Sequence, residues 1–81
     1  MEVYILEHRI LQNNVVETVT AFIGSTIEKV EEYIMNNQDY ADESEYWWWA
    51  VSNEIVDKDP LTYEKDLYFY DKKGNKLDYQ P

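Results

Sequence analysis

The sequence contains no cysteine, one histidine and two glycines, and each scarcity excludes a class of chemistry. Without cysteine the chain has no disulfide, no thiolate nucleophile and no cysteine-based zinc site. His8 alone could supply a Ser-His-Asp relay or a multi-histidine metal site, and its place in the first predicted strand favours a packing role instead. Gly24 and Gly74 are too few for a glycine-rich phosphate loop. We therefore expect a protein that is not an enzyme and binds no metal or cofactor.

Basic residues are also scarce, because 7 lysines and arginines stand against 17 acids, for a formal charge of −10. The acids concentrate in residues 28–66, which hold 12 of them and 3 bases. Nucleic acids and anionic membranes bind proteins mainly through positive charge on the protein, and this chain is strongly acidic. We therefore expect no direct contact with either. A basic protein is the natural partner, although the same charge also suits plain solubility.

Long apolar runs are absent, and no stretch approaches the roughly 18 apolar residues of a membrane span. The first ten residues carry Glu2, Glu7, His8 and Arg9, unlike a signal peptide. We expect a cytoplasmic protein of a bacterium or a phage-infected host cell. With 81 residues the chain has material for one small core, so residues 1–81 are predicted to form a single domain.

Two segments rich in β-branched residues, 2–11 and 15–23, flank a pair of asparagines that suits a two-residue hairpin turn. If Asn13 and Asn14 form the turn, opposing residue numbers sum to 27. His8 then pairs with Val19, Leu6 with Ala21 and Tyr4 with Ile23. This face is the more apolar one, so we expect the helix to pack there.

Ser25-Thr26-Ile27-Glu28 matches a capping box, with Ser25 as the N-cap and Glu28 reaching back to it. Apolar residues at helical spacing extend the predicted helix to about Asn37. A strand from Tyr46 to about Val56 follows, and a second hairpin joins 67–70 to 76–79 through Asp71-Lys72-Lys73-Gly74. The sequence predicts an α+β domain of order ββαβββ, with a mainly antiparallel sheet and one helix across one face.

The motifs VYILEHR (residues 3–9) and FIGSTIEKVEEYI (22–34) resemble a family of small uncharacterised bacterial and phage proteins over residues 3–56. That family has a strand of the type VYxLEH, a strand ending in IGxYSS and an acidic helix. Here IGST stands where the family usually has a tyrosine and two serines. The resemblance implies an α+β fold and an association with phages, and it carries no known chemistry.

The segment EYWWWAV (45–51) is the most unusual part of the sequence. In a strand, Trp47 and Trp49 point to one face while Tyr46 and Trp48 point to the other. Two interpretations are open: Trp48 packs beneath the 58–66 loop, or it lies in an exposed aromatic patch. In the second case Tyr46 and Trp48 are the predicted partner-binding anchors. Neighbouring carboxylates would rim the patch, namely those of Asp39, Asp42, Glu43 and Glu45.

Small size, localised acidity and this aromatic strand suggest a non-catalytic inhibitor that occupies a basic, nucleic-acid-binding surface of a bacterial effector. The leading hypothesis is a counter-defence protein of a phage or mobile element, similar to an anti-CRISPR. An alternative is an immunity protein or antitoxin that neutralises a basic toxin nuclease. A third is a self-associating domain whose aromatic sheet face is buried in a homodimer.

Overall fold

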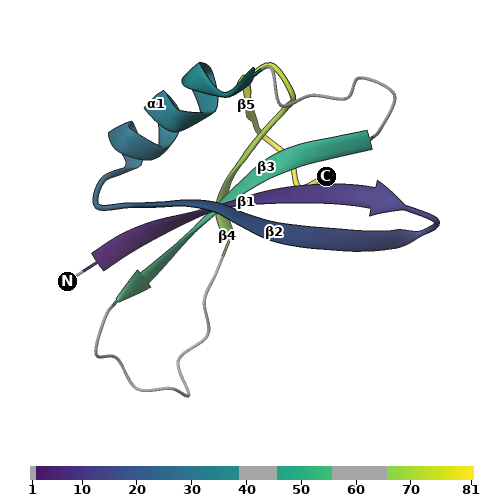
Figure 1. Cartoon of the computed structure of the whole chain (residues 1–81), viewed down its shortest axis with the longest axis horizontal. Coiled ribbons are helices and arrows are strands. Elements are labelled where there is room, and N and C mark those ends of the chain that lie inside the picture. Colours follow the sequence, from purple (N-terminus) through teal and green to yellow (C-terminus); the bar gives the residue numbers. More distant parts are fainter. Residues whose placement is uncertain (1, 39–45, 56–65) are drawn as a thin grey trace.

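The computed structural model describes residues 2–38, 46–55 and 66–81. The described elements are β1 (Glu2–Gln12), β2 (Val15–Gly24), α1 (Ile27–Asn36), β3 (Tyr46–Ile55), β4 (Asp66–Tyr70) and β5 (Lys76–Leu77). The strands form one sheet in the order β2-β1-β3-β4-β5, and every neighbouring pair is antiparallel (Figure 1). The predicted α+β class, the antiparallel sheet and the ββαβββ order are confirmed for this part of the chain.

The β1–β2 hairpin turns at Asn13 and Asn14, whose φ angles of 50° and 65° confirm the predicted two-residue turn. The predicted pairing holds from the turn as far as Glu7 opposite Thr20, and it includes His8 opposite Val19. Beyond that point the register shifts, because β2 holds one extra residue, Ala21.

The predicted pairs Leu6–Ala21 and Tyr4–Ile23 are therefore wrong: Leu6 lies opposite Phe22, and Tyr4 lies opposite Gly24. The bulge brings Phe22 to the same side of the sheet as Leu6. There its ring stacks on Tyr33 of α1, with centroids 4.7 Å apart and planes at 18°. The shift thus gives a large aromatic ring an apolar neighbour, which a regular hairpin would have denied it.

The two faces of the sheet differ in what they carry. The first, here called the core face, holds the cross-strand pairs Leu6–Val51, His8–Trp49 and Ile10–Trp47. Two residues of α1, Val30 and Ile34, are buried and belong to the same apolar cluster as the core-face side chains. The second, here called the opposite face, holds the alternate residues, including Glu7, Arg9, Tyr46, Trp48 and Ala50.

The start of α1 differs from the prediction. Its N-cap is Thr26, whose Oγ1 accepts a hydrogen bond from the Lys29 amide at 3.3 Å. A capping box between Ser25 and Glu28 is therefore wrong, because the helix begins one residue later and places Lys29 at the third helical position. Ser25 instead accepts from the Lys29 ammonium, with Nζ and Oγ 3.1 Å apart.

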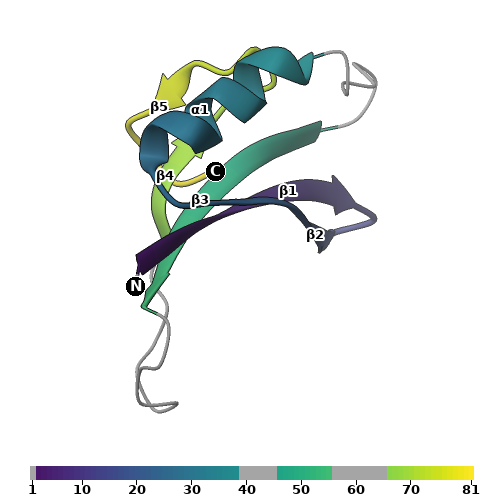
Figure 2. The ribbon, with the colours of Figure 1, turned by 60° about the vertical axis from the view of Figure 1, so that its left-hand side comes forward.

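The end of α1 lies where the sequence indicated. Asn37 is the C-cap, and its Nδ2 donates to the Tyr33 carbonyl at 2.8 Å. One residue further on, Gln38 Nε2 donates to the Lys73 carbonyl in the turn between β4 and β5. Figure 2 shows this end of α1 close to the β4–β5 hairpin. The polar end of the helix is thus joined to the far edge of the sheet.

The β4–β5 turn confirms the role predicted for Gly74, which has a φ of 85°. Its amide donates to the Asp71 carbonyl at 3.0 Å, and the Asp71 carboxylate accepts from the amides of Lys73 and Asn75 at 2.9 Å each. The following strand is shorter than the predicted 76–79, because β5 includes only Lys76 and Leu77.

Candidate functional site

The three tryptophans of β3 alternate between the faces as predicted, yet all are buried. Their exposed fractions are 3% for Trp47, 7% for Trp48 and 0% for Trp49. Of the two interpretations left open by the sequence, burial is the one that holds for Trp48. An exposed indole patch is therefore wrong as a description of this strand. The loop expected to cover Trp48 comprises residues 58–66, and residues 58–65 lie outside the described part of the chain.

Tyr46 behaves differently from its three neighbours. It is 57% exposed at the beginning of β3, on the opposite face, and its ring centroid lies 5.6 Å from that of Trp48. Of the two predicted anchors, Tyr46 is therefore the accessible one, and Trp48 lies behind it. The four acids predicted to rim the site, Asp39, Asp42, Glu43 and Glu45, lie outside the described residues.

A cavity of about 420 Å³ opens beside the first residues of β3. Its lining includes Tyr46, Trp47 and Trp48 of β3, together with Lys72 and Tyr79 from the C-terminal region. Lys72 Nζ lies 5.9 Å from the centroid of the Trp47 ring, within the range of a cation–π contact. The cavity thus combines flat aromatic walls with an ammonium group.

Two indole N–H groups beside this cavity, those of Trp47 and Trp48, are buried and have no hydrogen-bond partner among the described residues. A buried donor without an acceptor costs about 1–3 kcal/mol of stability. Neither nitrogen is accessible on its surface, so these donors do not form part of the exposed lining. They mark a place where close packing of rings has been favoured over hydrogen bonding.

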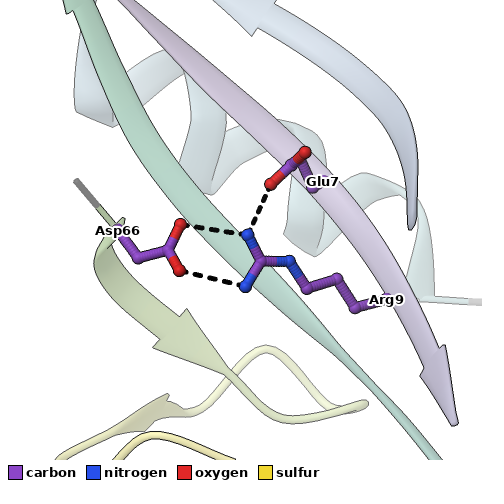
Figure 3. A network of polar contacts seen from close by, with 3 residues as sticks. All are labelled: Glu7, Arg9 and Asp66. Atoms are coloured by element: carbon purple, nitrogen blue, oxygen red, sulfur yellow. Dashed lines mark hydrogen bonds and ion pairs between the residues drawn. The ribbon is translucent and has the colours of Figure 1, made fainter. Parts of the chain in front are cut away.

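The opposite face carries a three-residue ionic network around Arg9 (Figure 3). Arg9 Nη1 and Nη2 donate to the two carboxylate oxygens of Asp66 at 3.0 Å each, and Nη2 also donates to Glu7 Oε1 at 2.7 Å. The two-pronged contact matches the planar guanidinium to the planar carboxylate. Arg9 lies on β1 and Asp66 on β4, so the network crosses β3, which runs between them.

The sequence of β3 explains why the Arg9 side chain can cross over this strand to reach Asp66. Ala50 of β3 lies opposite Glu7 on β1 and opposite Phe69 on β4, and its methyl group leaves room above the strand. Burial lowers the pKa of the Arg9 guanidinium, but hydrogen bonds to Asp66 and Glu7 outweigh that effect and raise it overall. Arg9 therefore stays charged and is engaged with two carboxylates.

Glu7 and Arg9 lie two residues apart on β1, and their side chains form an ion pair in which Nη2 and Oε1 are 2.7 Å apart. Sequence reasoning missed Asp66, because an acid at the end of an ambiguous loop resembles any solvated loop residue. The signal that could have identified it was the register of the sheet. Asp66 lies opposite Ser52 of β3 and on the same face as Arg9.

His8 is 7% exposed and lies among aromatic rings on the core face. Its ring centroid is 4.5 Å from that of Trp47, edge to face, and 5.3 Å from that of Trp49. The expected packing role next to Val19 is confirmed. In the described part of the chain, no group of three or more histidine or acidic side chains is placed to hold a metal ion.

Carboxylates cover the solvent side of α1. Glu28, Glu31 and Glu32 are all exposed. Glu31 also accepts a hydrogen bond from the Tyr70 hydroxyl at 3.3 Å. Burial of Tyr70, together with the negative charge of Glu31, raises the pKa of its phenol well above the usual value. The helix therefore presents a row of negative charge outward while Val30 and Ile34 point into the core.

No family model, no curated protein and no solved structure matches this chain. The resemblance to small bacterial and phage proteins thus remains a prediction. Among the described residues, no helix is both long and apolar enough to cross a membrane.

Proposed function

We propose that this protein is a non-catalytic inhibitor that binds a basic surface of another protein. The observation that carries the proposal is the run of negative charge leading to an exposed aromatic residue. It begins with the exposed glutamates of α1, continues in the sequence through Asp39, Asp42, Glu43 and Glu45, and ends at Tyr46, which is 57% exposed. Carboxylates in such a row can occupy a groove that otherwise holds phosphates, because its lysines and arginines respond to charge.

The arrangement of α1 supports this role. Val30 and Ile34 are buried in the same apolar cluster as core-face side chains, whereas the glutamates of the helix lie in solvent. Glu28 and Glu32 lie one helical turn apart, and neighbours at that spacing repel each other in the free protein. A partner that supplies lysine or arginine side chains relieves this repulsion on binding.

Tyr46 is the proposed anchor of the interface, because tyrosine offers a large rigid ring with a polar end. Trp48 supports it from behind, with ring centroids 5.6 Å apart. At 7% exposure Trp48 can contribute little direct contact in this conformation. The binding role proposed for Trp48 is therefore to hold Tyr46 in place.

The finer hypothesis is a cytoplasmic counter-defence protein of a phage or mobile element, comparable to an anti-CRISPR. The partner would be a bacterial effector with a basic nucleic-acid-binding surface. An immunity protein or antitoxin for a basic nuclease meets the same physical demand. The neighbouring genes separate the two, since a toxin gene favours immunity and phage genes favour counter-defence.

The decisive experiment starts with affinity capture from host lysate and identification of the partner by mass spectrometry. Affinity for that partner is then measured for the wild type and for a variant with Asp42→Lys, Glu43→Lys and Glu45→Lys together. We expect the triple variant to lose at least tenfold in affinity and most of the salt dependence. Glu17→Lys, which changes an exposed acid on β2, is the control and should bind nearly as the wild type does. Unchanged affinity and salt dependence in the triple variant would contradict the proposal.

Self-association is a second candidate function. The homodimer expected through the aromatic sheet face loses support, since the three indole rings are buried and Tyr46 alone among the four β3 aromatics is exposed. A different surface, the edge of the sheet at β2, has the features of an interface.

A further inference from the structure

The two edges of the sheet are protected to very different degrees. At one edge β5 has two residues, whereas at the other β2 has ten. Edge strands are usually shielded by lysine, proline or a short length, since their free backbone groups otherwise pair with another chain. β2 contains no lysine and no proline, and Glu17 is its only charged residue.

Apolar side chains on β2 are unusually open to solvent. The exposed fractions are 60% for Val15, 48% for Val16, 59% for Val19 and 60% for Ile23. In the described part of the chain, no strand lies beyond β2 in the sheet. The edge therefore combines unpaired backbone groups with an apolar surface around them.

The turn geometry indicates which backbone groups face outward. In a two-residue hairpin the residues flanking the turn, here Gln12 and Val15, exchange hydrogen bonds, and bonded pairs then alternate along the ladder. Val15, Glu17 and Val19 thus direct their amides and carbonyls toward β1. Their neighbours Val16, Thr18 and Thr20 direct theirs toward the free edge.

We propose that β2 binds β2 of a second copy of this chain in an antiparallel pair centred on Thr18. Thr18 lies opposite Thr18 of the partner copy, and Val16 lies opposite Thr20. In this register each outward amide and carbonyl of these three residues meets a complementary group. The two sheets then continue as one across a two-fold axis.

Side-chain chemistry favours this register over its neighbours. Glu17 lies opposite Val19 of the second copy, so the two Glu17 carboxylates are not directly opposed. A shift by one hydrogen-bonding step toward the turn would place Glu17 against Glu17 and leave Thr20 unpaired. A shift in the other direction would place Val19 against Val19 and leave the backbone of Val16 unpaired.

Charge also selects the occupant of this edge. β2 holds only one of the 17 acids of the chain, so it offers a basic partner little to bind. Two copies each carry a charge of −10 and repel one another at a distance. Salt screens that repulsion, so dimerisation should strengthen as salt rises. A single pair of strands buries less area than the roughly 1,000 Å² of a stable interface, and we therefore expect a weak, reversible dimer.

The inference is independent of the proposed function, because binding to a basic partner should weaken as salt rises and dimerisation should strengthen. Sedimentation velocity at several protein concentrations and two salt concentrations gives the oligomeric state. A monomer at all concentrations up to the millimolar range would overturn the proposal.

Cross-linking between single introduced cysteines tests the register, because the native chain contains no cysteine that could react instead. Opposed residues in a bonded antiparallel pair have Cα atoms about 5.5 Å apart, which suits a disulfide. Under mild oxidation the Thr18→Cys variant should form a covalent dimer at least tenfold faster than Val16→Cys or Thr20→Cys alone. A mixture of the latter two variants should form the heterodimer rapidly. Faster cross-linking by Val19→Cys than by Thr18→Cys would overturn this register.

A matched pair of variants tests the backbone contact. Thr18→Pro removes an amide that faces outward, so it leaves the β1–β2 hydrogen bonds intact and should weaken dimerisation at least tenfold. Thr18→Ala keeps the amide and should dimerise nearly as the wild type does. Circular dichroism verifies that each variant is folded. Equal dimerisation by folded Thr18→Pro and Thr18→Ala would contradict pairing through this edge.

Discussion

Strands β2 and β3 each have ten residues, both are rich in apolar side chains, and they flank β1 on its two sides. Residues 47–52 of β3 are buried without interruption, whereas residues 15–20 of β2 are all exposed. His8 shows the contrast at one position: its neighbour on one side, Trp49, is 0% exposed, and its neighbour on the other, Val19, is 59% exposed. Place in the sheet order, rather than hydrophobicity alone, decides the environment of each strand.

Both faces of β3 are covered by recognisable groups. On the core face Trp47, Trp49 and Val51 belong to the same buried cluster as Val30 and Ile34 of α1. On the opposite face the Arg9 side chain crosses over β3 toward Asp66. Among the described strands β2 pairs with β1 alone. Its contact with α1 includes Phe22, near the end away from the turn. The central strand is thus buried, whereas residues 15–20 of the edge strand remain exposed.

The largest expected effect on stability comes from a comparison of Trp49→Ala in β3 with Val19→Ala in β2. Removal of a fully buried indole should reduce the free energy of unfolding by about 3–5 kcal/mol. Removal of two exposed methyl groups should change it by less than about 0.5 kcal/mol. Urea unfolding followed by circular dichroism measures both. If the two variants lost similar amounts of unfolding free energy, the two positions would be equally well packed. That result would contradict the contrast between the strands.

The next effect concerns the network across β3. Arg9→Gln should destabilise the fold by about 1–2 kcal/mol, because it leaves two partly buried carboxylates with a weaker donor. Asp66→Asn should cost somewhat less, since Glu7 still holds the guanidinium. A double-mutant cycle with both changes should give a coupling energy of about 1 kcal/mol. A coupling near zero would show that Arg9 and Asp66 contribute independently.

A smaller effect is expected where the chain leaves β2 and enters α1. Thr26→Ala removes the oxygen that accepts from the Lys29 amide and should cost about 1 kcal/mol. Ser25→Ala removes only a contact with the flexible Lys29 side chain, so it should cost a few tenths of the loss expected for Thr26→Ala. Thermal unfolding of the two variants distinguishes them. A greater loss for Ser25→Ala would restore the capping box that the sequence suggested.

The smallest effect at neutral pH is predicted for Tyr70→Phe, and it should grow at alkaline pH. Because the folded protein raises the pKa of Tyr70 above its usual value near 10, the stabilisation is complete below that pH and is lost as pH rises above it. The wild type should therefore lose stability between about pH 9 and 11.5 more steeply than Tyr70→Phe. Tyr79→Phe, an exposed position, serves as the control and should follow the wild type. Parallel pH profiles for the wild type and Tyr70→Phe would contradict the assignment.

Much of the fold could be predicted from local signals. Asn13-Asn14 and Asp71–Gly74 mark turns through backbone preferences that act within a few residues. The alternation of Trp47, Trp48 and Trp49 follows from strand geometry. The bulge at Ala21 could not be foreseen, because it depends on Phe22 meeting Tyr33 of a later helix.

The candidate site was less accessible to sequence reasoning. Periodicity indicates which side chains share a face, but it does not indicate how well that face is covered. Trp48 and Tyr46 have the same predicted orientation, and yet one is 7% and the other 57% exposed. Their difference depends on which segments lie against the first residues of β3, and these segments follow much later in the chain.

The contact between Arg9 and Asp66 joins residues that are 57 positions apart. Ordering so much chain is entropically costly, whereas the β1–β2 hairpin closes across two residues and forms on a microsecond timescale. The guanidinium can reach its carboxylate only when β3 has taken its place between β1 and β4. The ion pair between Arg9 and Asp66 is therefore expected to form late in folding, and a nascent chain shorter than 66 residues would lack it.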